Sequence, residues 1–362
     1  MKKIVLTVTN DLTYDQRMHK ICTSLVSANY EVELVGRELP HSIPIDEKVF
    51  AQTRLRCFFG KGKLFYAEYN LRLFVYLLTQ RFDLLCAVDL DTIVAVVLAA
   101  KTKRKKVVFD AHEHFTEVPE VIRRPAVQRV WKWIESVFVP MADAHYTVSS
   151  GLAEIFTRES RRNFELVMNV PVLEPRVEKQ YSAEKYMLYQ GALNEGRGLE
   201  HLLEAMKEID CPLYLAGEGD FSQKLRQLSV TYGVEHKVKF LGFVKPSDLK
   251  KITADAWLGL HISEPLGLSY YYSLGNKFFD YIHAGLPQVC TSMPEYEQIN
   301  QKFEVALMIK TSTSQEIKRA IQRLLTEPML YERLRKNCEV CAQHYNWQKE
   351  EKKLLNIYEQ LL

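Results

Sequence analysis

A glycine-rich segment, residues 189–198 with the sequence YQGALNEGRG, has residue types that suit a phosphate group. It follows an apolar run and leads into apolar residues at helical spacing. Glycine, here including Gly191 and Gly198, lets the backbone approach an anion closely, and the helix start offers free N–H groups. Arg197 adds a fork-shaped cation. The alternative is a glycine-rich turn with a surface arginine, because the spacing matches neither GxGxxG nor GxxxxGK(S/T).

A second loop that leads into a helix, residues 273–287, combines a cation with a carboxylate. We expect Asn276 and Lys277 in the first turn of this helix and Asp280 on the same face, three residues after Lys277. The carboxylate would then lie about 5 Å farther along the axis. A cation suits a phosphate, and a carboxylate suits the paired hydroxyls of a ribose. The alternative is an ordinary surface ion pair.

A third cluster, Asp110, His112, Glu113 and His114, follows an apolar run ending at Phe109. It could be a strand end in which histidine bonds the backbone, or part of a reactive site. A metal site is not favoured, because two histidines at i and i+2 lack a third ligand in a recognisable motif.

These segments need a scaffold, and the hydrophobic pattern predicts one. Short apolar runs alternate with helical patterns in the first half of the chain, which indicates a parallel sheet covered by helices on both faces. The expected strands there are 3–9, 31–35, 84–88, 107–109 and 146–148.

After the proline-containing stretch 171–175 the pattern starts again. The expected strands of this second half are 187–190, 213–216, 238–240, 257–262 and 288–291. The sequence therefore predicts an α/β protein with two Rossmann-like domains. Ligands of such sheets bind beyond the carboxyl ends of the strands, so we expect the domains to face a central cleft. Residues 347–362 carry one apolar stripe and predict an amphipathic helix.

Composition excludes several classes of protein. The 362 residues are 47% hydrophobic and 26% charged, which is typical of globular domains rather than disordered chains. No run of 18 uncharged apolar residues occurs, so we expect a cytoplasmic protein without a spanning helix or a cleaved signal. The net charge of +3 and the lack of interleaved basic and aromatic residues argue against nucleic-acid binding. The turn at residues 9–15 has no glycine, which argues against a nicotinamide site there.

The two loop-to-helix segments resemble motifs of the retaining nucleotide-sugar glycosyltransferases of family four, which have the B-type fold of two Rossmann domains. The resemblance extends to residues 215–220 (LAGEGD), 240–244 (FLGFV) and 346–347 (NW). Residues 9–17 and 109–113 are similar to members that build bacterial surface polysaccharides. The resemblance covers nearly the whole chain and is strongest over residues 189–294.

The resemblance implies an acceptor-binding domain at 1–172, a nucleotide-sugar-binding domain at 173–344 and a helix at 345–362 that crosses back to the first domain. It implies that Arg197 and Lys277 neutralise the leaving diphosphate and that His112 contacts the donor sugar. The other donor-side residues it implies are Gly191, Gly198, Gly217, Phe243, Val244, Asn276 and Asp280. The acceptor-side residues it implies are Asn10, Asp15, Arg17 and Glu113.

Two positions depart from the family pattern. Ala192 stands where the family has an arginine, and Tyr272 stands where it has the first of two glutamates. A charged hydrogen bond contributes about 1.5–3 kcal/mol, so the missing arginine would cost about ten- to a hundredfold unless it is replaced. Lys277 is the candidate replacement for the arginine, and Glu264 for the glutamate.

The resemblance therefore implies transfer of a hexosyl group from a UDP- or GDP-linked sugar to a glycan or lipid-linked acceptor, with retention and without a metal or other cofactor. A nucleotide-sugar epimerase of the same fold is an alternative, with Asp110, His112 and Glu113 as its acid and base groups. A non-catalytic polysaccharide-assembly subunit is another, suggested by the two departures. The basic run 101–106 and the segment 131–133 (WKW) fit a peripheral contact with the inner face of a membrane.

Overall fold

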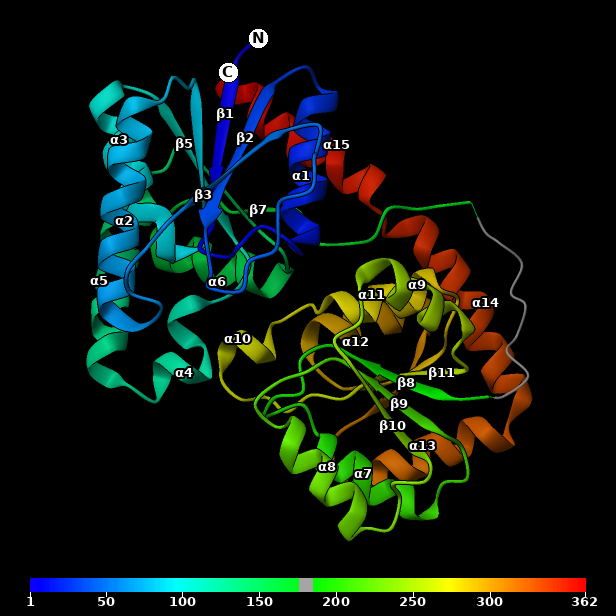
Figure 1. Ribbon diagram of the computed structural model, residues 1–362. Coiled ribbons are helices and arrows are strands. Elements are labelled where there is room, and N and C mark those ends of the chain that lie inside the picture. The colour runs from blue at the N-terminus through cyan, green and yellow to red at the C-terminus, as the bar shows by residue number, and fades with distance from the viewer. Residues whose placement is uncertain (176–184) are drawn as a thin grey trace. The chain divides into compact units, whose positions relative to one another are not determined.

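The computed structural model describes residues 1–175 and 185–362, which form two compact units. Unit 1 comprises Met1–Asn169 and Lys349–Leu362, and unit 2 comprises Val170–Gln348. Each unit is built around one parallel sheet with helices packed against it (Figure 1). The expectation of two Rossmann-like domains is confirmed.

The sheet of unit 1 has seven strands in the order β3-β2-β1-β4-β5-β6-β7. These strands are β1 (Lys3–Thr7), β2 (Glu31–Arg37), β3 (Ala51–Leu55), β4 (Leu84–Val88), β5 (Lys106–Ala111), β6 (Ala144–Thr147) and β7 (Glu165–Leu166). The helices are α1 (Gln16–Ser27), α2 (Gly62–Thr79), α3 (Leu90–Lys103), α4 (Pro119–Ile122), α5 (Pro125–Phe138), α6 (Ser150–Ser160) and α15 (Trp347–Leu361). Helices α2, α3 and α5 lie on one side of this sheet, and α1 and α15 lie on the other (Figure 1).

The sheet of unit 2 has six strands in the order β10-β9-β8-β11-β12-β13. These strands are β8 (Met187–Gln190), β9 (Leu213–Ala216), β10 (Val238–Gly242), β11 (Leu258–His261), β12 (Gln288–Thr291) and β13 (Ala306–Ile309). The helices are α7 (Leu199–Ala205), α8 (Ser222–Thr231), α9 (Pro246–Asp255), α10 (Leu268–Tyr271), α11 (Asn276–His283), α12 (Pro294–Phe303), α13 (Ser314–Thr326) and α14 (Pro328–His344).

Both sheets reverse their strand order at one point, and this fixes where ligands can bind. The reversal lies between β1 and β4 in unit 1 and between β8 and β11 in unit 2. The connections that leave two such neighbouring strands diverge to opposite faces of the sheet, which opens a crevice beyond their carboxyl ends. In unit 2 the glycine-rich segment 191–198 leaves β8 at this point.

The last helix, α15, belongs largely to unit 1, although α14 before it belongs to unit 2. Its apolar stripe is buried there, since Leu354, Ile357 and Tyr358 are at most 1% exposed. The Glu350 carboxylate also accepts a hydrogen bond from the Met168 N–H at 2.9 Å. The expected amphipathic helix is therefore present, and the chain returns to its first unit. No helix within the described ranges is long and apolar enough to cross a bilayer.

Candidate functional site

Two glycines bring the ends of neighbouring strands of unit 2 into backbone contact. Gly191 follows β8 with a φ of +121°, and Gly217 follows β9 with a φ of +147°. A Cβ on Gly217 would lie 2.0 Å from the Gly191 carbonyl oxygen. The Gly191 N–H donates to Ala216, and the Gly217 N–H donates to Gly242. Only glycine fits at Gly217, and the resulting surface at the strand ends is bare backbone.

The segment that follows Gly191 contacts the loop after β11. The Gly196 carbonyl accepts a hydrogen bond from the Glu264 N–H at 2.8 Å, which ties the segment to the loop after β11. Gly198 precedes α7 with a φ of +60°, and a Cβ there would lie 2.4 Å from Ile262. Between these glycines the partly buried Arg197 places its guanidinium 4.6 Å from the ring centre of Tyr270.

Lys277 lies in the first turn of α11 and faces the same glycine surface. Its Nζ is 3.9 Å from the ring centre of Tyr189 and 3.8 Å from the position that a Cβ on Gly191 would occupy. Burial and the nearby Arg197 guanidinium hold the pKa of Lys277 well below its usual value. Burial, Lys277 and Arg197 likewise hold the pKa of His261 well below its usual value. Two partly buried cations thus lie near each other and near a neutral histidine, an arrangement that an anion would stabilise.

One helical turn beyond Lys277, Asp280 contacts the end of β8. Its Oδ2 accepts a hydrogen bond from the Gln190 side-chain amide at 2.8 Å. Gln190 is the last residue of β8 and is only 4% exposed. The helix α11 therefore presents a cation in its first turn and an anchored carboxylate in its second, both near the carboxyl ends of unit 2's strands.

Unit 1 holds a separate buried charge network where β5 ends. Arg17 from α1 donates to Asp110 at 2.5 Å and, through Nε, to His112 Nε2 at 2.7 Å. Receiving the Arg17 bond requires a lone pair on Nε2, so the neutral ring carries its proton on Nδ1, which lies 3.4 Å from Asp89. On protonation Nε2–H can donate to Asp110 instead, 3.2 Å away. Burial opposes this charge, but Asp110 and Asp89 outweigh it and raise the pKa of His112.

Two family models match the chain, one over each unit. The model described as "Glycosyltransferase Family 4" matches residues 16–167, and the one described as "Glycosyl transferases group 1" matches residues 173–340. The chain belongs to these family-four, group 1 glycosyltransferases. Its fold is their B-type fold.

Individual relatives agree with this family but share only part of their length. An uncharacterized glycosyltransferase of Methanocaldococcus jannaschii, MJ1607, is 29% identical over 182 residues, which are 48% of this chain and 45% of the relative. The lipopolysaccharide core biosynthesis glycosyltransferase LpsD of Rhizobium meliloti is 26% identical over 181 residues, 48% of this chain and 50% of the relative. The chain thus spans about half the length of the curated relatives it matches. Among solved structures, Anabaena HepE in complex with UDP-glucose has a TM-score of 0.77 at 15% identity, with each chain covered in full.

The structure brings some of the predicted donor-side residues together. Gly191, Arg197 and Lys277 meet at the end of β8. Gly217 joins them through Gly191, and Asp280 lies on the same helix as Lys277.

The remaining donor-side residues lie on adjacent loops. Asn276 is exposed as the first residue of α11, and Phe243 is 60% exposed after β10. Val244 packs on the apolar cluster around Tyr186 and Leu188.

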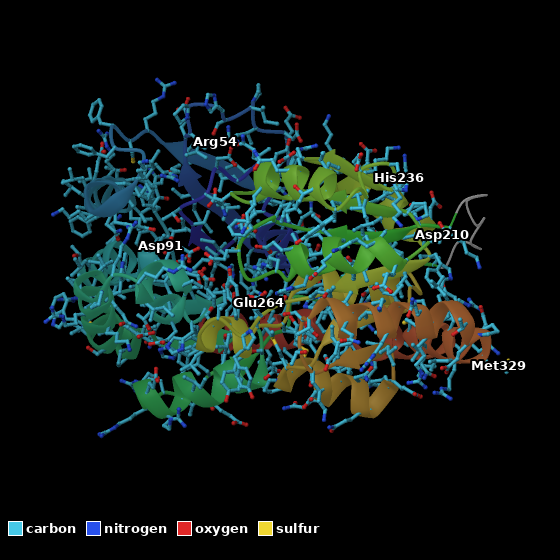
Figure 2. All side chains as sticks on the ribbon, turned by 90° about the horizontal axis from the view of Figure 1, so that it is seen from below. Arg54, Asp91, Asp210, His236, Glu264 and Met329 are labelled. Atoms are coloured by element: carbon cyan, nitrogen blue, oxygen red, sulfur yellow. The ribbon has the colours of Figure 1, made fainter. Side chains whose placement is uncertain are left out.

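The two departures from the family pattern also have clear positions. Ala192 is exposed beside Gly191, and its carbonyl accepts from the Tyr189 hydroxyl at 3.0 Å. Lys277 faces this backbone, and its expected role in place of the missing arginine stays a prediction. Tyr272 follows α10, while Glu264 lies on the loop after β11. Figure 2 labels Glu264. The role suggested for Glu264 stays a prediction.

The predicted acceptor-side residues of unit 1 lie in three places. Arg17 joins the His112 network. Asn10 donates to Asp15 at 2.6 Å, and Asp15 caps α1 by accepting from the Met18 N–H at 3.0 Å. These two side chains therefore shape the turn after β1. Glu113 is exposed on the loop next to His112.

Sequence reasoning missed two carboxylates that follow β4. Asp89 has a φ of +56°, and its Oδ1 accepts from the His112 N–H at 2.7 Å. Burial and Asp89 raise the pKa of Asp91 to about 7, and Asp91 accepts from the Thr9 hydroxyl. Figure 2 labels Asp91 within unit 1. Their position at the end of an expected strand, beside the strand-order reversal, is a signal that could have identified them.

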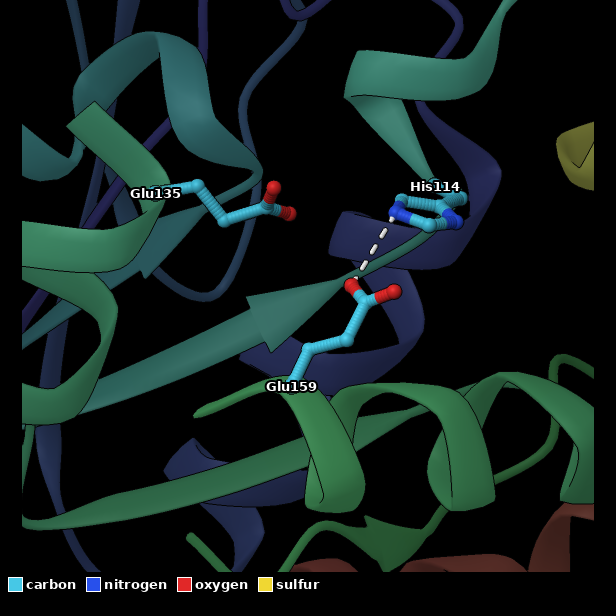
Figure 3. Close-up of side chains that lie close together, drawn as sticks. All are labelled: His114, Glu135 and Glu159. Atoms are coloured by element: carbon cyan, nitrogen blue, oxygen red, sulfur yellow. Dashed lines mark ion pairs between the residues drawn. The ribbon is translucent and has the colours of Figure 1, made fainter. Parts of the chain in front are cut away.

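His114, Glu135 and Glu159 form one further cluster, shown in Figure 3. One ligand atom from each lies within 4.8 Å of the others, which is close enough for a shared ion. His114 Nε2 is 3.5 Å from Glu159, and Glu135 accepts from the Thr116 hydroxyl at 3.2 Å. An ion pair and a hydrogen bond thus account for the grouping. The expectation that no metal is needed stays a prediction.

Proposed function

We propose that this protein transfers a hexosyl group from a nucleoside diphosphate sugar to a glycan or lipid-linked acceptor, with retention, in the synthesis of surface polysaccharide. The observation that carries the proposal is that two cations, Arg197 and Lys277, lie near bare glycine backbone in unit 2. The named function of one relative supports the pathway, since LpsD acts in lipopolysaccharide core biosynthesis. The HepE complex supports the donor class, since that protein binds UDP-glucose.

The leaving group explains why two cations are needed. Negative charge builds on the β-phosphate as the glycosidic bond breaks, and preorganised donors aimed at this charge are a large catalytic term. Arg197, Lys277 and the N–H groups that begin α11 supply such donors without a metal ion. Asp280 then accepts hydrogen bonds from the ribose of the same nucleotide. A bound diphosphate also offsets the cost of holding Lys277 charged near Arg197.

His112 of unit 1 contacts the donor sugar in this proposal. Both of its ring nitrogens face groups of its own unit, so the network with Arg17 and Asp89 fixes the ring's orientation. The retaining outcome rests on membership of the family.

A peripheral membrane contact on the cytoplasmic side would suit a lipid-linked acceptor, and helix α5 is the best candidate surface. Val130 is 58% exposed and Trp133 is 60% exposed, with Arg129 exposed beside them. Lys132 is exposed as well, but it pairs with Glu117 at 2.8 Å. Aromatic and basic residues in this pattern suit an anionic lipid surface. Trp131, by contrast, is buried against Phe115, so Trp133 is the tryptophan of segment 131–133 that this surface exposes.

The basic run 101–106 offers fewer unpaired cations to a membrane surface than the sequence predicts. Lys105 pairs with Asp83, and Lys106 pairs with Asp143, each at 2.9 Å. Lys103 donates to the Gln80 carbonyl. These three lysine side chains are therefore held by contacts within the protein.

Flotation with phosphatidylglycerol vesicles and with neutral vesicles tests this surface. The double variant Val130→Ser with Trp133→Ser should lose the binding to anionic vesicles. Met329→Ser is the control, because Met329 is 83% exposed on α14 of the other unit (Figure 2). Equal binding to both kinds of vesicle would contradict the proposed contact.

A donor screen that monitors nucleotide release with and without acceptor tests the transfer itself. Arg197→Ala and Lys277→Ala should each lower turnover far more than they lower folding stability. An epimerase would convert the donor without acceptor-dependent nucleotide release. A non-catalytic subunit would neither release nor bind nucleotide, and either result would refute the proposal.

A further inference from the structure

Gln190 is a buried polar residue for which the sequence pattern predicts no role. It ends β8, and its side chain bonds to two helices that are each more than 60 residues away from it in the sequence. Its Nε2 lies 2.8 Å from Asp280 Oδ2 on α11, and its Oε1 lies 2.7 Å from the Thr253 hydroxyl on α9. Thr253 is 3% exposed.

The chemistry of the three groups fixes the direction of these bonds. A carboxylate only accepts, so the Gln190 amide must turn its NH₂ group toward Asp280. Its carbonyl oxygen then faces Thr253, whose hydroxyl must donate to it. The Thr253 oxygen also lies 2.7 Å from the Leu249 carbonyl, but one hydroxyl has one proton. The bond to Gln190 therefore competes with the intrahelical bond to Leu249 for this proton.

The backbone of Gln190 reinforces the connection to α11. Its N–H donates to the Tyr281 hydroxyl at 3.2 Å, and that hydroxyl donates to the Leu188 carbonyl at 3.1 Å. Tyr281 neighbours Asp280 on the same helix. The end of β8 thus holds α11 at two successive residues, once by main chain and once by side chain.

We propose that Gln190, supported by Thr253, positions the Asp280 carboxylate to receive the hydroxyls of a nucleotide ribose. This inference rests on the proposed function, because it requires that a nucleotide occupies unit 2. The bond from Gln190 restricts the conformers of the half-buried Asp280 side chain, so less binding energy is lost in ordering it when a ligand binds. Gln190 and Thr253 are positioning residues, and neither needs to touch the ligand.

The test compares UDP and GDP with their 2′,3′-dideoxy analogues by calorimetric titration. A hydrogen bond to a charged group contributes about 1.5–3 kcal/mol, so the natural protein should prefer the ribose form by about 10- to 150-fold. Asp280→Asn should reduce this preference. Gln190→Met, close in length but without hydrogen-bonding groups, should reduce it at least tenfold while inorganic pyrophosphate still binds as in the natural protein. Thr253→Val should give a smaller reduction and provides a second route if Gln190→Met does not fold.

Thr231→Val is the matched control. Thr231 lies on α8, and its hydroxyl bonds the carbonyl of Gln227, four residues earlier, at 3.0 Å. This variant should keep the ribose preference unchanged.

The outcomes separate the inference from the function on which it rests. A Gln190→Met variant that keeps the natural ribose preference overturns the inference and leaves the proposed transfer intact. If the natural protein binds nucleotides without any preference for the ribose form, the inference is likewise overturned and the proposed transfer is left intact. A natural protein that binds no nucleotide and no pyrophosphate overturns both. A parallel loss of pyrophosphate binding in Gln190→Met would show a general packing role and would also overturn the inference.

Discussion

Replacing Lys277 with methionine should weaken nucleotide binding without weakening the fold. Most buried side chains stabilise the folded state, so their removal destabilises it. Lys277 differs, because burial and Arg197 both disfavour its charged form, as its lowered pKa indicates. Its main favourable contact without ligand is the ring of Tyr189, 3.9 Å away. Methionine keeps much of the side-chain volume and removes the charge.

The two effects can be sized separately. A charge-assisted hydrogen bond to phosphate contributes about 1.5–3 kcal/mol, so affinity for a nucleoside diphosphate should fall about 10- to 150-fold. The lost contact with Tyr189 costs about 0.5–2 kcal/mol, and methionine regains part of it against the ring. Removing the buried charge acts in the opposite direction. The free energy of unfolding should therefore change by no more than about 1 kcal/mol in either direction.

The pH dependence of stability gives a third readout. The pKa of Lys277 is lower in the folded protein than in the unfolded chain, where it is about 10.4. Between these two values the unfolded chain binds more protons, so stability rises with pH across that window. Lys277→Met should remove this part of the slope.

Urea unfolding without ligand and calorimetric titration with UDP and GDP measure these effects. Lys207→Met is the control, because Lys207 is exposed and lies 4.6 Å from the ring centre of Tyr232 in the same unit. It should leave nucleotide affinity unchanged. If Lys277→Met instead loses more than about 2 kcal/mol of stability and keeps its affinity, Lys277 is a packing residue and the anion-site reasoning is wrong.

Three further substitutions test other parts of the structure. Gly217→Ala places a Cβ 2.0 Å from the Gly191 carbonyl oxygen, at a φ of +147°. In urea unfolding this substitution should destabilise unit 2 by more than about 1 kcal/mol. An unchanged unfolding midpoint would contradict the close approach of the two strand ends. Arg17→Met removes the closest charge partner of the fully buried Asp110 carboxylate and leaves it with His112, 3.2 Å away, so it should cost up to about 3–5 kcal/mol, and a cost below about 1 kcal/mol would show that the Arg17–Asp110 pair is dispensable. Asp91→Asn should stabilise the protein at pH 8 but little at pH 4. The pKa of Asp91 is about 7 in the folded protein and lower in the unfolded chain, so the natural protein loses stability as the pH rises between these two values. Equal gains in stability at both pH values would refute this assignment.

The sequence predicted most of the fold because buried parallel strands leave a clear signal. The core of β1, Ile4 to Leu6, is fully buried and reads as a continuous apolar run. Strand β3 was missed because Ala51–Leu55 is an edge strand with the polar sequence AQTRL. Helix α2 was missed because its apolar residues are spread around the helix rather than gathered on one face.

The candidate site was only partly predictable, for a different physical reason. Arg197 and Lys277 stand beside glycines and helix starts, which are local signals. The bonds of Gln190 to Asp280 and Thr253 join residues 90 and 63 positions apart. A buried glutamine at the end of a strand gives no local hint of its partners, since only the tertiary structure brings them within hydrogen-bond distance.

The charge balance of the two units gives an independent reason to expect the diphosphate in unit 2. Arg17 of unit 1 is buried, but Asp110 already neutralises it at 2.5 Å, so an incoming anion there would compete with a carboxylate. In unit 2 the dominant charge acting on Lys277 is another cation, Arg197, and Lys277 adjoins the exposed backbone of Gly191. An anion gains most where buried positive charge is unbalanced. Two results together would reverse the assignment of the donor to unit 2. Asp110→Asn would have to create nucleotide affinity, and Lys277→Met would have to leave the nucleotide affinity intact.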